Sequence, residues 1–292
     1  MTDVTTTGER LLFLHDADVT AQPAPGIQQL SRTLGLDLDL PRHPGFGAPL
    51  EGEALEWDSV ADLAQHHLLR LDAEDGRAAA ADNSNSNSNS NGGRANGSAP
   101  HGHTPDPRPL HLAGAGFGGW IALEMAVRAR HRFASLTLVA PYGVKLFGPT
   151  DREFADILLL DPAETVELGW ADPSACHGLR MPGFPAGLDD REYEEAFAER
   201  AALSRFVWKP FLHDPRLRRW LHVLTMPTLV VAGDRDRMVA PGHSRALADL
   251  IPSARYAEIP GSGHYPYLET PGAFAETVAA FVSEHLKTGE ER

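Results

Sequence analysis

The sequence predicts an α/β protein in which a mostly parallel sheet is covered by helices on both faces. Short apolar strands alternate with helix-like segments in the first and last parts of the chain, the pattern of parallel α/β folds. A block with mostly helical signals interrupts this alternation at 142–222. We therefore expect a core made of 1–141 and 223–292 and an inserted helical cap made of 142–222.

The first part of the chain begins with a short apolar strand, Leu11 to Leu14, which ends at His15 and Asp16. Further along, hydrophobic periodicity predicts a helix over 27–34, an alternating strand over 36–40 and an amphipathic helix over 59–71. Ser59, with Asp62 three residues later, is a plausible N-cap for that last helix.

The composition changes sharply between about 73 and 107. Asn and Ser alternate from Asn83 to Asn91, and Gly, Pro and His follow. Such a tract cannot bury enough apolar surface to offset its ordering entropy, so we expect a disordered surface insertion. The nearby His101, His103 and His111 lack neighbouring carboxylates or cysteines, and the sequence therefore predicts no metal site.

The second part of the chain begins with the strand Pro109 to Ala113 and the glycine turn 114–119. The elements expected after the turn are a helix over 117–130, a strand over 136–139, cap helices over 151–160, 189–206 and 215–224, a strand over 227–231, a helix over 244–250, a strand over 255–259 and a helix over 273–286.

The glycine turn admits two interpretations. Gly114, Gly116 and Gly119 match G-x-G-x-x-G, which would bind NAD or FAD. That site expects an acidic residue about twenty positions later, at the end of the next strand, and only Ala140-Pro141-Tyr142 stands there. Alternatively, Gly114-x-Gly116-x-Gly118 is a nucleophile elbow, G-x-S-x-G, in which glycine replaces serine. The missing acid favours the elbow and a site without a cofactor.

An elbow predicts an acid and then a histidine further along the chain. Asp234 and Asp236 follow one apolar strand, and His264 follows the next in Gly261-Ser262-Gly263-His264. Each lies just past the C-terminal end of its strand, where open α/β sheets place their chemistry. The order and the positions both fit the elbow interpretation.

These residues make the chain resemble the α/β-hydrolase superfamily, in particular its cap-bearing group related to C–C bond hydrolases, epoxide hydrolases and esterases. The similar motifs are His43 to Gly47, Phe117 to Trp120, Pro227 to Val239, and Gly263-His264 with Leu268-Glu269. The resemblance implies that Asp236 is the catalytic acid, with Asp234 as the weaker alternative, and that His264 is the base.

Two positions depart from the family's pattern. Gly116 stands where the family has its serine nucleophile, and His15-Asp16 stands in place of its His-Gly oxyanion turn. In the family's terms the oxyanion donors would be the N–H groups of Phe117 and Ala17. A negative charge on Asp16 would oppose oxyanion stabilisation unless its side chain points away.

The resemblance predicts a hydrolase-related protein that acts on a small, partly apolar molecule. His264, oriented by Asp236, would activate water or abstract a proton from the substrate. Two alternatives remain open: a non-catalytic pseudoenzyme that binds a ligand or a protein partner, and a serine hydrolase in which mutagenesis introduced Gly116. Three aromatic residues are expected to line the pocket: Trp120, Tyr142 and Phe147. Cys176, which lies in the cap, is not expected to replace the nucleophile.

Charge and cysteine content restrict the partners. The net charge is −14 and the isoelectric point is about 5.4, which disfavours nucleic-acid binding. With one cysteine the chain forms no internal disulfide, and no apolar run approaches about 18 residues. We expect a cytoplasmic protein with a small-molecule partner. The sequence leaves its oligomeric state open.

Overall fold

The computed structural model describes residues 8–17, 24–46, 57–86, 108–176 and 190–286. Its core is a six-stranded sheet in the order β2-β1-β3-β4-β5-β6, and all neighbouring strands are parallel. The strands are β1 (Arg10–Leu14), β2 (Asp37–Asp39), β3 (Leu110–Ala115), β4 (Ser135–Val139), β5 (Thr228–Gly233) and β6 (Ala254–Ile259). The predicted α/β fold with a parallel sheet is confirmed.

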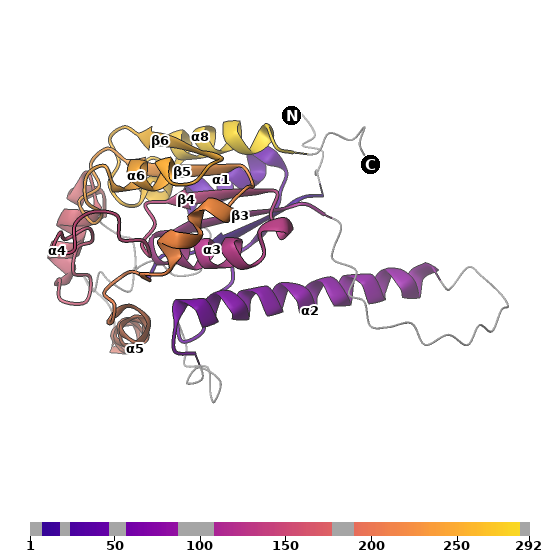
Figure 1. The fold of residues 1–292 in the computed structure, drawn as a ribbon, viewed down its shortest axis with the longest axis horizontal. Helices are drawn as coiled ribbons and strands as arrows, with labels where there is room; N and C mark the ends of the chain where they lie inside the picture. The colour runs from indigo at the N-terminus through magenta and orange to yellow at the C-terminus, as the bar shows by residue number, and fades with distance from the viewer. Residues whose placement is uncertain (1–7, 18–23, 47–56, 87–107, 177–189, 287–292) are drawn as a thin grey trace.

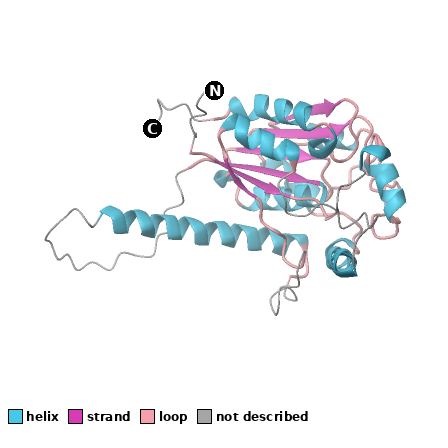
Figure 2. Ribbon diagram, turned by 180° about the vertical axis from the view of Figure 1, so that it is seen from behind, coloured by secondary structure: helices cyan, strands magenta, loops and turns pink. Residues whose placement is uncertain are grey.

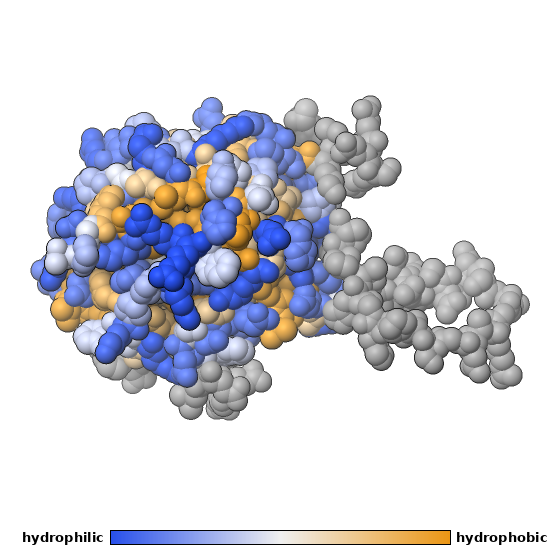
Figure 3. All heavy atoms as spheres, in the orientation of Figure 1, coloured by the Kyte–Doolittle hydropathy of each residue, from blue (hydrophilic) through white to orange (hydrophobic). Residues whose placement is uncertain are grey.

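Helices pack on both faces of the sheet (Figures 1 and 2). On one side lie α1 (Pro25–Leu34) and α8 (Pro271–Ser283), and on the other lie α2 (Val60–Ser86), α3 (Gly116–Arg128) and α6 (His243–Asp249). Successive strand residues alternate between these layers: Leu12 belongs to the core cluster of α2 and α3, whereas Phe13 belongs to the cluster of α1 and α8. The face shown in Figure 3 mixes hydrophilic residues with hydrophobic patches.

The chain between β4 and β5 contains the helices α4 (Pro162–Gly169) and α5 (Asp190–Val207) and the 3₁₀ turns η3 (Pro173–Cys176) and η4 (Leu217–Val223). The expected α-helix over 215–224 is therefore a 3₁₀ segment. Four short elements were not predicted: α4 and η3 in this segment, and η2 (Arg130–Arg132) and α7 (Pro266–Glu269) outside it.

The expected helix over 151–160 is wrong. Phe154 instead forms an antiparallel bridge with Val239. The buried Glu153 carboxylate turns inward and accepts the backbone N–H groups of Leu146 and Phe147 at 2.6 and 2.8 Å. These tertiary hydrogen bonds take the place of a local helical ladder, which the periodicity alone had suggested.

The expected disorder from about residue 73 is also corrected, because α2 continues as a helix to Ser86. The run Ala78 to Ala81 supplies the residue type with the highest helix propensity, and ion pairs fix the turns before it. The rest of the Asn/Ser-rich tract, with His101 and His103, lies outside the described residues.

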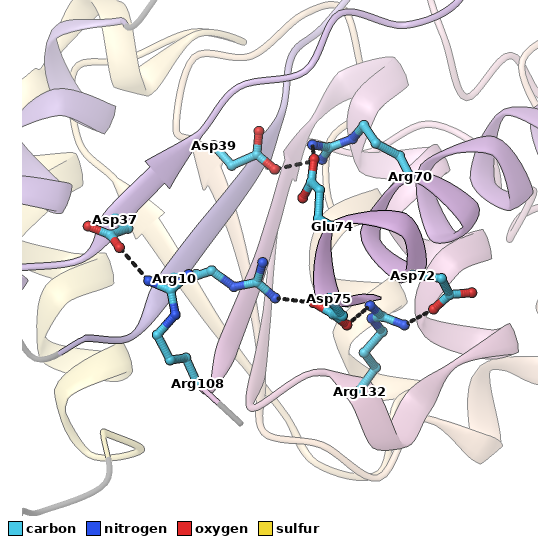
Figure 4. A network of polar contacts seen from close by, with 9 residues as sticks. All are labelled: Arg10, Asp37, Asp39, Arg70, Asp72, Glu74, Asp75, Arg108 and Arg132. Carbon is cyan, nitrogen blue, oxygen red and sulfur yellow. Dashed lines mark hydrogen bonds and ion pairs between the residues drawn. The ribbon is translucent and has the colours of Figure 1, made fainter. Parts of the chain in front are cut away.

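A network of ion pairs joins α2 to the sheet (Figure 4). Asp75 of α2 lies 3.4 Å from Arg10 of β1 and also pairs with Arg132, which in turn contacts Asp72. Arg70 pairs with Asp39 of β2 at 2.6 Å. The pairs cross from one helix to two strands and to the segment before β4, so they fix the direction of α2.

Asp75→Ala is expected to destabilise the protein by about 3 kcal/mol, because it leaves the largely buried guanidinium of Arg132 without its most buried partner. The matched control is Glu74→Ala, whose ion pair with Arg70 is about a third exposed on the carboxylate side and whose loss should cost under about 1 kcal/mol. Urea unfolding of the two variants measures the difference. Equal losses would show that burial does not set the strength of this network.

Candidate active site

Six polar or turn-forming positions, from the loops after five strands, meet at the carboxyl edge of the sheet. His15 and Asp16 follow β1, Gly116 follows β3, and Tyr142 follows β4. Asp236 follows β5 and His264 follows β6. Parallel strands bring all of their carboxyl ends to the same edge, so residues far apart in sequence become neighbours there.

The turn between β3 and α3 has the geometry of a tight strand-to-helix elbow. Gly116 lies in the left-handed region, with φ of 47°. A Cβ added to Gly118 would overlap the carbonyl oxygens of Leu14 and His15, and one added to Gly114 would overlap the carbonyl of Gly118. These glycines let the start of α3 rest directly against the end of β1.

Asp236 and His264 form a buried hydrogen-bonded pair. Nδ1 of His264 lies 2.9 Å from Oδ2 of Asp236. Oδ1 of Asp236 accepts the N–H groups of Met238 and Val239 at 2.8 and 3.1 Å, which fixes the carboxylate. Asp234, the alternative acid, instead accepts the N–H groups of Gly261 and Ser262, and it thereby stabilises the loop before His264.

Backbone contacts hold the His264 loop in place. The N–H of His264 donates to the carbonyl of Gly169 at 2.6 Å. The Glu269 carboxylate accepts the N–H groups of Gly263 and Ala171, each at 2.8 Å. These hydrogen bonds tie the loop to the C-terminal end of α4 and to the residue Ala171 beyond it. The backbone of His264 is thus fixed by Gly169, and its imidazole is fixed by Asp236.

The side chain of Asp16 occupies the space of the missing nucleophile. A Cβ added to Gly116 would overlap Cγ and both oxygens of this carboxylate. Oδ1 accepts the N–H groups of Ala17 at 2.7 Å and Phe117 at 2.9 Å. These are the two donors that the sequence predicts for an oxyanion, and the structure brings them together on a carboxylate. Asp16 points into the site rather than away from it, a direction that its sequence position could not reveal.

The second oxygen of Asp16 faces the histidine. Oδ2 lies 3.2 Å from Nε2 of His264, an ion-pair distance. The same nitrogen hydrogen bonds to the hydroxyl of Tyr142 at 3.1 Å. Oδ2 is buried, and among the residues that the structure describes its ion-pair partner is His264.

Two carboxylates determine the protonation of His264. Burial alone would lower its pKa, but the charges of Asp236 and Asp16 outweigh that effect and raise the pKa to about 10. The ring is therefore an imidazolium at neutral pH and lies between two carboxylates. In this resting arrangement His264 is a proton donor, whereas the sequence predicts a base.

The three predicted pocket residues lie in different places. Tyr142 stacks on His264, with ring centroids 5.4 Å apart. Trp120 is buried and packs on Phe117, with centroids 6.4 Å apart. Phe147 is 41% exposed and packs on His243. Tyr142 thus contacts His264. Trp120 belongs to the core and also lines a cavity with Phe206 and His213, and Phe147 lies at the surface. Their part in binding a substrate stays a prediction.

The other candidate residues serve structural roles. His111 lies near the amino end of β3, where it contacts Glu9 at 2.9 Å and Ser135 at 2.8 Å. Cys176 is buried, and burial raises the pKa of its thiol. Within the described ranges, no cluster of three or more histidine, cysteine, aspartate or glutamate side chains is arranged to hold a metal ion. None of the helices in these ranges has the length and apolarity needed to span a membrane.

A family model described as "Alpha/beta hydrolase family" matches residues 12–277. The chain is 29% identical to the epoxide hydrolase EphH of Mycobacterium tuberculosis over 187 residues, covering 59% of this chain and 85% of that protein. It is 40% identical over 93 residues to the pimeloyl-[acyl-carrier protein] methyl ester esterase of Xanthomonas campestris pv. campestris, covering 32% of this chain and 37% of that one.

A 67-residue stretch is 48% identical to the polyketide synthase ThaQ of Burkholderia thailandensis, covering 23% of this chain and only 3% of the synthase. Among solved structures, the fold is similar to the meta-cleavage product hydrolase CumD of Pseudomonas fluorescens IP01, with a TM-score of 0.64 and 17% identity over 94% of this chain and 91% of that one. At this identity the likeness shows the fold.

Proposed function

Because the chain belongs to the alpha/beta hydrolase family, we propose that it is a small-molecule hydrolase in which Asp236 and His264 do the proton chemistry without a serine. The observation that carries this proposal is the 2.9 Å hydrogen bond between the two side chains, at the carboxyl edge of the sheet and facing the Gly116 turn. A histidine held by a carboxylate in this way is a general acid–base group.

The proposed substrate is a small, partly apolar molecule that binds beneath a cap formed by residues 142–222. The relatives named above include an epoxide hydrolase and a methyl ester esterase, so epoxides and esters are the first classes to consider. The aromatic rings of Tyr142 and Phe154, 5.4 Å apart, would supply apolar surface beside His264.

His264→Ala is expected to abolish turnover, by about a hundredfold or more, of any substrate found in a screen of epoxides, esters, lactones and C–C bond substrates. The matched control is His131→Ala, a histidine on the exposed η2 turn, which should keep full activity. The measurement is the initial rate of substrate turnover by each of the two variants and by the wild type. Turnover that persists in His264→Ala would contradict the proposed role of this histidine.

A second candidate function is ligand binding without catalysis. It is favoured by Asp16, which fills the nucleophile's space and engages both backbone donors, so that a carbonyl substrate could not reach them. This function predicts no turnover by the wild-type protein anywhere in the screen, together with saturable binding of a screen compound measured by calorimetry. The His264 variant would then change affinity rather than rate.

A further inference from the structure

The carboxylate of Asp16 lies where the side chain of a nucleophile at position 116 would lie. It contacts the two oxyanion donors and His264, as such a nucleophile would. We propose that Asp16, supplied by the loop after β1, is a covalent catalytic residue that replaces the missing side chain at position 116 and attacks a saturated carbon of an epoxide. This inference rests on the proposed hydrolase function and names the group that forms the intermediate.

The two oxygens of Asp16 have different environments. Oδ1 is held by the N–H groups of Ala17 and Phe117, so the carboxylate has one orientation. Oδ2 is buried and forms an ion pair with Nε2 of His264 at 3.2 Å. The side chain is 1% exposed. Because Oδ2 is excluded from water, no hydration shell has to be removed before it attacks, and the step that precedes attack is the opening of its ion pair with His264.

The chemistry of a carboxylate favours attack on a saturated carbon. Attack on a carbonyl would form an anhydride, which is less stable than the ester it replaces. The carbonyl oxygen would also need Ala17 and Phe117, whose N–H groups are already engaged by Oδ1. Attack on a saturated carbon produces an alkyl ester of Asp16 and leaves those hydrogen bonds in place for the next step.

In the first step a lone pair of Oδ2 forms a bond to one carbon of the epoxide. The bond from that carbon to the ring oxygen breaks, and its electron pair remains on the oxygen. The proton on Nε2 of His264 transfers to this oxygen, directly or through the Tyr142 hydroxyl 3.1 Å away. The products are a hydroxyalkyl ester of Asp16 and a neutral His264.

In the second step water attacks Cγ of Asp16 and gives its proton to His264. The negative charge develops on Oδ1, where the N–H groups of Ala17 and Phe117 stabilise it as oxyanion donors. The bond from Cγ to Oδ2 then breaks, and Oδ2 leaves in the product with a proton from His264. The resulting carboxylic acid returns its proton to the imidazole, which restores the resting state, and the balance is epoxide plus water giving a diol.

The charge on Asp16 switches His264 between its two roles. As a carboxylate it helps to keep the ring protonated, as the first step requires. Esterification removes this charge, so the pKa of His264 falls and the ring can accept a proton from water. An epoxide fits this site better than an alkyl halide, because its leaving oxygen needs the proton that His264 holds.

Heavy-oxygen labelling tests the covalent step with styrene oxide as the probe. In water enriched in oxygen-18, an excess of enzyme over substrate should give a diol whose new oxygen is unlabelled, since it comes from Asp16. Many turnovers should then place the label in the peptide that contains Asp16. A labelled diol from the first turnover and an unlabelled peptide would overturn the proposal in favour of direct attack by water.

Two variants separate this proposal from the proposed function. Asp16→Asn should lower epoxide turnover by about a thousandfold or more, whereas Asp249→Asn, on the exposed end of α6, should change nothing. Wild-type protein quenched with acid during turnover should carry the ester, seen as a mass increase of one styrene oxide on the Asp16 peptide, whereas His264→Gln, which lacks the proton donor of the first step, should carry none. If esters are hydrolysed in a His264-dependent way while Asp16→Asn is fully active, the hydrolase function stands and the role of Asp16 falls. The role of Asp16 is also overturned if no form of the protein gives an adduct or turns over the epoxide.

Discussion

Gly116→Ser alone is expected to give a protein that a fluorophosphonate probe does not label, whereas Gly116→Ser combined with Asp16→Gly is expected to be labelled. A Cβ at position 116 would overlap the carboxylate of Asp16, and the left-handed backbone, with φ of 47°, adds strain for any residue with a side chain. Removing the carboxylate clears the space for a serine hydroxyl. It also frees the N–H groups of Ala17 and Phe117 for an oxyanion.

In the double variant the loss of Asp16 should also change the protonation of His264. Without Asp16, one of the two charges that raise the pKa of His264 is lost, so the ring can act as the base that a serine requires. Hydrolysis of p-nitrophenyl acetate should exceed that of either single variant by about a hundredfold, the size of effect expected of an oxyanion donor. Asp16→Gly alone is the control, because it opens the site without adding a nucleophile.

The result bears on how the chain lost its serine. If Gly116 were a single substitution in an ordinary serine hydrolase, reversal at that position would restore labelling by itself. The position of Asp16 argues that two residues, Gly116 and Asp16, belong together as one arrangement. Strong labelling of Gly116→Ser with Asp16 intact would contradict this and show that the carboxylate moves aside.

The parts of the site that the sequence predicts depend on backbone topology. Parallel strands fix which loops share an edge, so the positions of Asp236, His264 and the N–H groups of Ala17 and Phe117 follow from the order of the elements. The Asp236–His264 contact required only that two adjacent loops meet. These contacts are present in the structure, while their catalytic roles remain proposals.

The parts that could not be predicted depend on side-chain direction. Asp16 was expected to disturb an oxyanion or point away, and which of these holds depends on the torsion of one side chain. The absence of a helix over 151–160 has a similar origin, because the inward turn of Glu153 toward the N–H groups of Leu146 and Phe147 is a tertiary contact. Helix α2 continues past residue 73, where Asp75 pairs with Arg10 and Arg132. Both arginines lie in distant segments of the chain, so these contacts could not be predicted from the local sequence.

The free energy of unfolding is expected to fall as the pH rises from about 6.5 to about 10. His264 has a folded-state pKa of about 10, raised above the ordinary value of about 6.5 for an unfolded chain. The stability that its charge provides is therefore fully present below about pH 6.5 and is lost as the pH approaches 10. At about 1.4 kcal/mol for each pKa unit, the loss is on the order of a few kcal/mol.

A second group of histidines produces the opposite slope at acid pH. Burial lowers the pKa values of His43, His67 and His111 below 6.5. The unfolded chain takes up protons there before the folded one does, so stability also falls as the pH drops below about 6.5. The two slopes together predict a maximum of stability near that pH.

His264→Gln separates the two slopes. This variant should lose most of the alkaline decline and keep the acid one, while His131→Gln, on the exposed η2 turn, should leave both unchanged. Asp16→Asn should reduce the alkaline decline only in part, because Asp236 still faces Nδ1 of the ring at 2.9 Å. Urea unfolding between about pH 5 and pH 10 measures all three variants. An alkaline decline as steep in His264→Gln as in the wild type would mean that His264 is neutral in the folded protein, and the first step proposed for Asp16 would then need another proton donor.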